Sequence, residues 1–405
     1  MAAKRTHSSE STGRKTTSRV IGRLAIGTLL LTLAGCATPP RPVPESTHLK
    51  ATLPLLENVR TWGDQRPTDL RAWLDWNLER PETLTSIADT EHHYLALSVG
   101  GPFGAFGAGV LAGWSHSGNR PDFTIVTGIS AGALQAPFAF LGSEYDKVLQ
   151  DVFTAHSTWD IARPRGVVSA VWGDGAMSSS PLYELIQKHI DSPLIKKIAA
   201  EHQKGRRLYI GTTHLYAERP MIWDIGKIAQ SDMPEAKSLI HRILLASASM
   251  PGIFPPVMLQ VEIDGQVYEE MHVDGGTTST VFFSPNSIEW DTIAKALNVS
   301  GPPRLYVLQN LYLDPTWQTT PKQTLPIAMR SVVSMIRAQG VGDIYRMYQN
   351  AKQDRIDFNL IHIPSTFREQ PKELFDPTFM KKLYTLGHDM GRKESGWEKR
   401  PPGTE

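Results

Sequence analysis

Residues 123–141 read FTIVTGISAGALQAPFAFL, and this stretch decides the fold. The β-branched run 123–127 predicts a buried strand, and 131–141 has the length and small apolar residues of a buried helix. Between them lies GISAG, a match to GxSxG, in which Gly128 and Gly132 allow a turn so sharp that the serine hydroxyl is exposed at the start of the helix. The pattern therefore predicts a nucleophile at Ser130.

A second glycine-rich turn, SVGGPFG, follows the apolar run YLALSV about 30 residues earlier. Its backbone N–H groups at Gly100 and Gly101, with that of Phe103 as a further candidate, are predicted to face an oxyanion, helped by the N–H of Ala131. Pro102 has no N–H to offer. The alternative is a nucleotide-phosphate loop, but its glycine pattern is incomplete and no acidic residue is placed for a ribose.

A base is needed because a serine hydroxyl is a weak nucleophile at neutral pH. The strongest candidate is Asp274 in HVDGG, at the end of the strand-like run QVYEEMHV and followed by Gly275 and Gly276. A DGG tripeptide is also a common turn. The rival bases are His362 and His388, which would complete the Ser, Asp, His order of an α/β-hydrolase. His272 lies on the same strand face as Asp274, where it could tune the carboxylate.

The glycine-rich turn, GISAG and DGG, in this order, resemble the patatin-like phospholipase family over roughly residues 92–365. Further phrases that resemble bacterial members are GAFGAGVLAGW, which begins at Gly104, and LASASMPGIFPPV at 245–257. The resemblance implies a three-layer α/β/α fold with a mainly parallel sheet. It also implies a Ser130–Asp274 dyad without histidine and an oxyanion hole at Gly100 and Gly101. The first motif departs from the family, since Val99 and Phe103 replace a usual glycine and arginine, which makes phospholipid preference less secure than ester hydrolysis.

The rest of the chain alternates between predicted strands and helices, as in a parallel sheet covered on both faces. Further strands are expected at 94–99, 207–213, 305–311 and 358–363, and helices at 103–114, 181–202, 234–248 and 325–350. No internal repeat or long linker interrupts them. We therefore expect one catalytic domain over residues 61–405, with its core at about 92–365 and a C-terminal extension.

The N-terminus has the pattern of a bacterial lipoprotein signal. Six basic residues precede the apolar run LAIGTLLLTLAG, which at 12 residues is too short to span a bilayer and is followed directly by Cys36. Residues 1–35 are predicted to be a cleaved signal peptide and Cys36 the lipidated residue. Residues 36–60, which begin ATPPRPVPES, are predicted to be a Pro-rich tether. With Ala37 after the cysteine, we expect a lipoprotein of the bacterial cell envelope, at the outer membrane if the cell has one.

Composition excludes several classes of function. The chain has 42 Lys+Arg against 41 Asp+Glu and no basic block beyond the N-terminus, so no nucleic-acid partner is expected. A single cysteine rules out an intramolecular disulfide and a cysteine-rich zinc site. HExxH and EF-hand patterns are absent, so neither a metal nor another cofactor is predicted.

Together these features predict a lipid acyl hydrolase that forms an acyl-Ser130 intermediate, takes phospholipid or another lipid ester as substrate, and is held at a membrane through Cys36. Two alternatives remain open from the sequence. One is an α/β-hydrolase esterase with a histidine base. The other is an envelope lipoprotein that binds lipid or protein without turnover.

Overall fold

The computed structural model describes residues 41–404 apart from 55, 57, 66–80, 167–171, 232, 284–289 and 318. Residues Val43–Glu405 form one compact unit. The predicted signal peptide, residues 1–35, and the predicted lipidation site Cys36 lie outside the described residues. Both therefore stay predictions.

Within the described residues, nine strands form one sheet in the order β1-β7-β6-β3-β2-β10-β11, with β9 added to β6 and β8 to β9. The five strands from β6 to β11 in this order run parallel to one another. They are β2 (His93–Leu97), β3 (Ile125–Gly128), β6 (Arg207–His214), β10 (Arg304–Gln309) and β11 (Asp357–His362). The remaining four pair antiparallel at one side: β1 (Arg60–Trp62), β7 (Arg219–Asp224), β8 (Val257–Ile263) and β9 (Gln266–Asp274).

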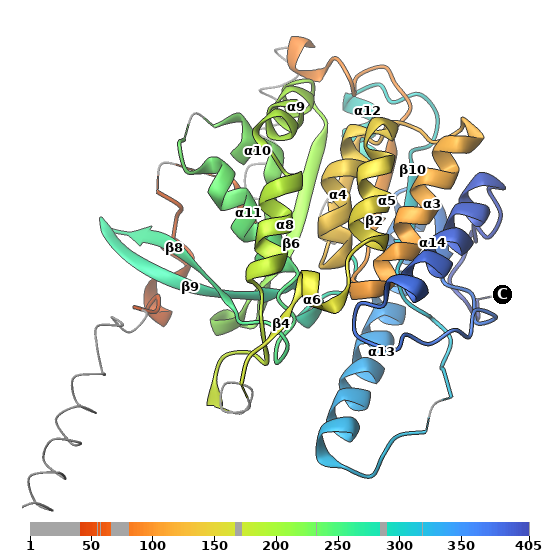
Figure 1. Cartoon of the computed structure of the whole chain (residues 1–405). Helices are drawn as coiled ribbons and strands as arrows, with labels where there is room; N and C mark the ends of the chain where they lie inside the picture. Colours follow the sequence, from red (N-terminus) through yellow and green to blue (C-terminus); the bar gives the residue numbers. More distant parts are fainter. Residues whose placement is uncertain are drawn as a thin grey trace, which may run out of the picture. The chain divides into compact units, whose positions relative to one another are not determined.

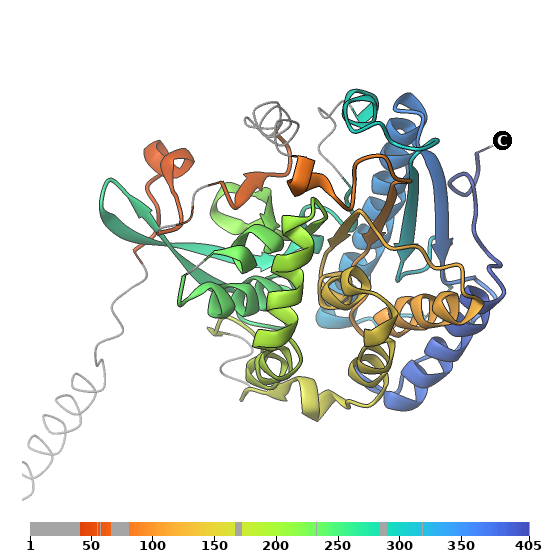
Figure 2. The same cartoon turned by 90° about the horizontal axis from the view of Figure 1, so that it is seen from above.

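Helices cover both faces of the parallel strands, which gives the predicted three layers (Figures 1 and 2). Successive residues of β2 show this directly, because Leu95 and Leu97 pack into one apolar core and Tyr94 and Ala96 into another. The helices are α3 (Gly104–Ser117), α4 (Ala131–Leu141), α5 (Asp146–Thr154), α6 (Thr158–Ile161), α8 (Ser180–His189), α9 (Ser192–Gln203), α10 (Ile225–Gln230), α11 (Ala236–Ser247), α12 (Trp290–Ala296), α13 (Thr324–Gln353) and α14 (Pro377–Arg392). The mainly parallel α/β fold is thus confirmed.

Local signals in the sequence account for most of these bounds, with one clear exception. The expected helix over 181–202 is two helices, α8 and α9, separated at Ile190 and Asp191. The Asp191 side chain accepts a hydrogen bond from the N–H of Leu194, and Pro193 occupies the first turn of α9. Because proline cannot continue a preceding helix, a new helix begins here.

The phrase GAFGAGVLAGW forms most of α3, and its glycines set how closely α3 packs on α14. A Cβ at Gly109 would lie 2.1 Å from the carbonyl oxygen of Tyr384, and one at Gly113 would lie 2.0 Å from that of His388. Gly387 and Gly391 make the reciprocal contacts with α3. Any larger residue would push the two helices apart, so the C-terminal helix is an integral part of the body.

The predicted tether is shorter than expected. Residues 36–40 lie outside the described part, but from Val43 onward the chain belongs to the compact unit. Leu53 and Val59 are buried in the main core, and Thr52 forms a bridge with Glu262 of β8. Pro54 is the last proline of the predicted tether. The apolar side chains near it are more stable when buried in the core than they would be in an extended, solvated segment.

Among the described residues, no helix combines the length and the apolar character needed to cross a membrane.

Candidate active site

The register of β6 brings the two predicted functional segments together. Its first half pairs with β3, ending at Gly128 opposite Ile210, and its second half pairs with β9, where Asp274 lies opposite Thr212. β7 pairs with β6 along its other edge, at Tyr209–His214. β3 and β9 therefore lie along the same edge of β6, and the C-terminal end of β3 faces the C-terminal end of β9. The residues that follow β3 and those that end β9 therefore meet at one point.

Ser130 stands at this point in a strained conformation. Its φ of 55° and ψ of −121° are rare for a non-glycine residue, as expected for the turn from strand to helix. Gly132 cannot be larger, because its Cβ would lie 2.3 Å from the carbonyl oxygen of Leu97. The N–H of Ser130 donates to Oγ of Ser247 at 3.0 Å, and that hydroxyl donates to the carbonyl of Gly211 at 2.7 Å. Ser247 thus holds the turn from α11.

The carboxylate of Asp274 accepts a hydrogen bond from the hydroxyl of Ser130 and a second one, at 2.7 Å, from the N–H of Gly276. Burial raises the pKa of Asp274 to about 7, although both hydrogen bonds act in the opposite direction. A carboxylate with a pKa near neutrality is well matched to take up a proton and release it again. The two residues singled out from the sequence are therefore in contact, 144 positions apart along the chain.

The glycine-rich turn lies beside this pair. Gly100, Gly101 and Ala131 line the same pocket as Ser130, and no hydrogen-bond acceptor for their N–H groups is found within the described parts of the chain. Gly101 has a φ of 52°, which favours glycine. The N–H of Phe103 donates to the carbonyl of Gly100 at 3.0 Å. Phe103 is therefore wrong as an oxyanion candidate, whereas the other three N–H groups are available.

The pocket has a volume of about 740 Å³ and an almost entirely apolar lining. Leucine, isoleucine, phenylalanine and methionine side chains from α4, α8, α11 and α13 contribute to it. The titratable side chains in the lining are Asp274, His189, Tyr312 and Arg337. The sequence reading missed His189 and Arg337. Neither belongs to a motif, and the one available signal was for Arg337, which is one of two arginines in the largely apolar helical run LPIAMRSVVSMIRAQG.

The rival histidine bases lie elsewhere. His362 contacts the carbonyl of Ile363 and the carboxylate of Glu398, and Nε2 of His388 lies 2.7 Å from Nδ1 of His116 on α3. Neither His362 nor His388 lines the pocket. Of the candidates weighed from the sequence, only Asp274 contacts Ser130.

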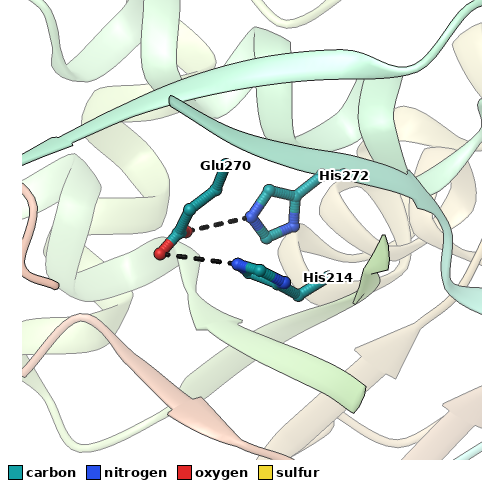
Figure 3. A group of neighbouring side chains, drawn as sticks. All are labelled: His214, Glu270 and His272. Atoms are coloured by element: carbon teal, nitrogen blue, oxygen red, sulfur yellow. Dashed lines mark hydrogen bonds and ion pairs between the residues drawn. The ribbon is translucent and has the colours of Figure 1, made fainter. Parts of the chain in front are cut away.

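His272 belongs to a separate buried cluster with His214 and Glu270 (Figure 3). Its Nε2 lies 3.2 Å from Glu270 and its Nδ1 lies 3.0 Å from Oγ1 of Thr212, while burial lowers the pKa of His272 to about 4. Burial favours protonation of Glu270, but the two imidazoles and the guanidinium of Arg60 beside it lower its pKa. The predicted tuning of Asp274 by His272 has no direct contact to support it.

The same three side chains could offer ligand atoms to a metal, since these atoms lie within 4.8 Å of one another. Their hydrogen bonds favour an ion-pair network instead. Arg60 already pairs with Glu270 through both carboxylate oxygens. Nδ1 of His214 accepts from the N–H of Ala217, so the proton of a neutral ring is on Nε2, the atom that faces Glu270. A metal ligand would need that nitrogen free of its proton.

Comparison with known proteins supports the family that the sequence resembles. Residues 95–285 match the family model described as Patatin-like phospholipase, which supports the patatin-like phospholipase family for this domain. The resemblance noted in the sequence is thereby confirmed. Among solved structures, VipD from Legionella pneumophila is similar with 12% identity and a TM-score of 0.38, over 76% of this chain and 67% of that one. No curated protein matches the chain.

Proposed function

We propose that the protein is a lipid acyl hydrolase with a Ser130–Asp274 dyad. The observation that carries this proposal is the hydrogen bond between the Ser130 hydroxyl and the Asp274 carboxylate at an apolar pocket of about 740 Å³. An apolar pocket of this size suits the acyl chains of a lipid ester. The family match supports the same class of substrate, since its domain is described as a phospholipase.

In the first half of the proposed reaction, Oγ of Ser130 attacks the ester carbonyl carbon as Asp274 takes the hydroxyl proton. The N–H groups of Gly100, Gly101 and Ala131 stabilise the negative charge on the carbonyl oxygen. The bond to the alcohol then breaks, and the leaving oxygen takes the proton from Asp274. The products are the free alcohol, or lysolipid, and acyl-Ser130.

In the second half, a water molecule replaces the alcohol. Asp274 takes a proton from this water, and the oxygen of the water attacks the acyl carbonyl carbon. Collapse of the second tetrahedral intermediate releases the fatty acid, and the proton on Asp274 returns to Oγ of Ser130. A carboxylate whose pKa is raised to about 7 can hold that proton through each intermediate and release it at the end.

We also propose that the protein works as a lipoprotein anchored through Cys36 in the bacterial cell envelope. The proposal depends on the charged and apolar pattern of residues 1–35 and on the cysteine that follows. An anchor of this kind would keep the pocket close to membrane lipids and raise the local concentration of substrate.

Hydrolysis of a panel of phospholipids, lysophospholipids and neutral esters, with products identified by mass spectrometry, tests the proposal. The wild type should release fatty acid, and Ser130→Ala and Asp274→Asn should each lose at least about 10²-fold in rate. His388→Ala is the matched control for a histidine base and should stay within twofold of the wild type. Full activity in Asp274→Asn would contradict the dyad.

A further inference from the structure

The N-terminal part of α13 carries apolar side chains that the described chain leaves largely exposed. From Gly340 onward the helix packs on the body, where Ile344, Met347 and Ala351 join the second core. The N-terminal end of α13 projects beyond the sheet, as the lower end of the helix in Figure 1 shows. The exposed side chains of this projection and of the loop before it form what we call the apolar rim: Trp317, Ile327, Met329, Val333 and Met335.

These side chains are unusually exposed for their type. Trp317 is 97% exposed, Met335 62% and Ile327 50%. Since each residue of an α-helix turns by about 100°, Ile327, Val333 and Met335 point to three different sides of α13. A helix that is apolar on several sides needs an apolar surrounding, and a protruding apolar patch marks a protein or membrane contact.

The apolar rim is continuous with the pocket that holds Ser130. Met329, Val333 and Met335 belong to both, and Thr316, the neighbour of Trp317, also lines the pocket. Ile161 of α6 also lines the pocket, and Trp159, two residues before it in the sequence, is 64% exposed. Tryptophan is enriched where proteins meet the interface of a bilayer. A surface that binds lipid at this rim would open directly onto the pocket.

Charge favours an anionic lipid surface over a second protein copy. Residues 314–339 contain three cations, Lys322, Arg330 and Arg337, and a single acid, Asp314. Two identical surfaces of net charge +2 would repel each other in a symmetric dimer. The same charge is attracted to phosphate groups of anionic lipids, at about 1 kcal/mol for each cation near the surface.

We infer that the apolar rim docks the protein on the surface of an anionic bilayer, with the N-terminal part of α13 inserted among the lipids. The rim deepens the proposed function, because it gives a lipid ester a path from bilayer to pocket without crossing water. Docking itself does not depend on turnover, so the two can fail separately.

The test uses the full chain with Ser130→Ala to prevent turnover and Cys36→Ser to remove the lipid anchor. Trp317→Glu with Ile327→Glu removes two rim side chains that do not line the pocket. Leu49→Glu with Val267→Glu is the matched control, since both residues are exposed and outside the pocket lining. Binding is measured by co-sedimentation with vesicles of phosphatidylglycerol and, separately, of phosphatidylcholine.

We expect the rim pair to weaken binding to phosphatidylglycerol vesicles at least tenfold and the control pair to change it less than twofold. Phosphatidylcholine vesicles should bind the parent protein several-fold more weakly. In protein that keeps the native Ser130, the rim pair should leave the hydrolysis of a soluble short-chain ester unchanged. Equal vesicle binding by rim and control pairs would overturn the inference, as would a dimer in solution that the rim pair dissociates. If the wild type does not hydrolyse esters but the rim pair still weakens vesicle binding, the proposed function is overturned and the inference about docking is not.

Discussion

Replacing Asp274 by asparagine should make the folded protein more stable at neutral and alkaline pH while it abolishes turnover. The carboxyl group is buried and its pKa is raised from 3.8 to about 7. The folded state therefore binds the proton of Asp274 more tightly than the unfolded state does. Asparagine keeps the shape and the acceptor oxygen, but it has no charge to bury.

The size of the effect follows from the pKa difference. A difference of about 3 pKa units between the unfolded and the folded state lowers the free energy of unfolding by about 4 kcal/mol once Asp274 is ionised in both states. Between about pH 4 and pH 7 the unfolded state has released this proton and the folded state has not, so stability falls as pH rises. From about pH 5 to pH 8, the wild type should lose on the order of 3 kcal/mol relative to Asp274→Asn.

Urea unfolding of both proteins at about pH 5 and pH 8 measures this difference. Asp343→Asn is a useful contrast, because the carboxylate of Asp343 is buried but pairs with Arg346 and accepts from the N–H of Thr280. Its replacement should destabilise the protein. A pH dependence of stability that is the same in the wild type and in Asp274→Asn would refute the reasoning about Asp274.

Three further predictions concern the surroundings of the dyad and the anchor. Ser247→Ala leaves the buried N–H of Ser130 without its acceptor and should cost about 1–3 kcal/mol in urea unfolding, together with at least tenfold in ester turnover; unchanged values for both would show that Ser247 does not hold the turn. Arg337→Gln should slow hydrolysis of anionic phospholipids several-fold more than that of neutral esters, because Arg337 is the one arginine in the pocket lining; equal loss on both substrates would argue against a role in head-group binding. Cys36→Ser should abolish acylation of the mature N-terminus, as seen by mass spectrometry, and release the protein from membrane fractions; an acylated N-terminus in this variant would contradict the lipoprotein proposal.

Local sequence signals were sufficient where neighbouring residues determine the structure. The helix expected at 131–141 is α4 with the same bounds, because the strand, the tight turn and the small apolar residues all act within 20 positions. The close packing of Gly132 on Leu97 explains why the second glycine of GISAG is required. Ser130 and Asp274 could be singled out because both stand in short motifs.

Features that depend on distant pairing could not be read from the sequence. The antiparallel addition of β9 to β6 brings Asp274 beside Ser130, but alternation along QVYEEMHV does not specify which strand it will pair with. Ser247 reaches Ser130 from α11, 117 positions away, and no motif marks its side chain as an acceptor. Leu53 and Val59 are buried by residues that come later in the chain, so the local Pro-rich composition overstates the length of the tether.

The most direct test of the central claim is the labelling of Ser130 by a fluorophosphonate, followed over time by intact mass and peptide mapping. We expect one adduct, on Ser130, in the folded wild type and a rate lower by about 10²- to 10⁴-fold in Asp274→Asn. His189→Gln, which changes the one histidine in the pocket lining, should label at close to the wild-type rate. Absence of the adduct from Ser130 in folded protein, or equal labelling rates in the wild type and Asp274→Asn, would contradict a Ser130–Asp274 dyad.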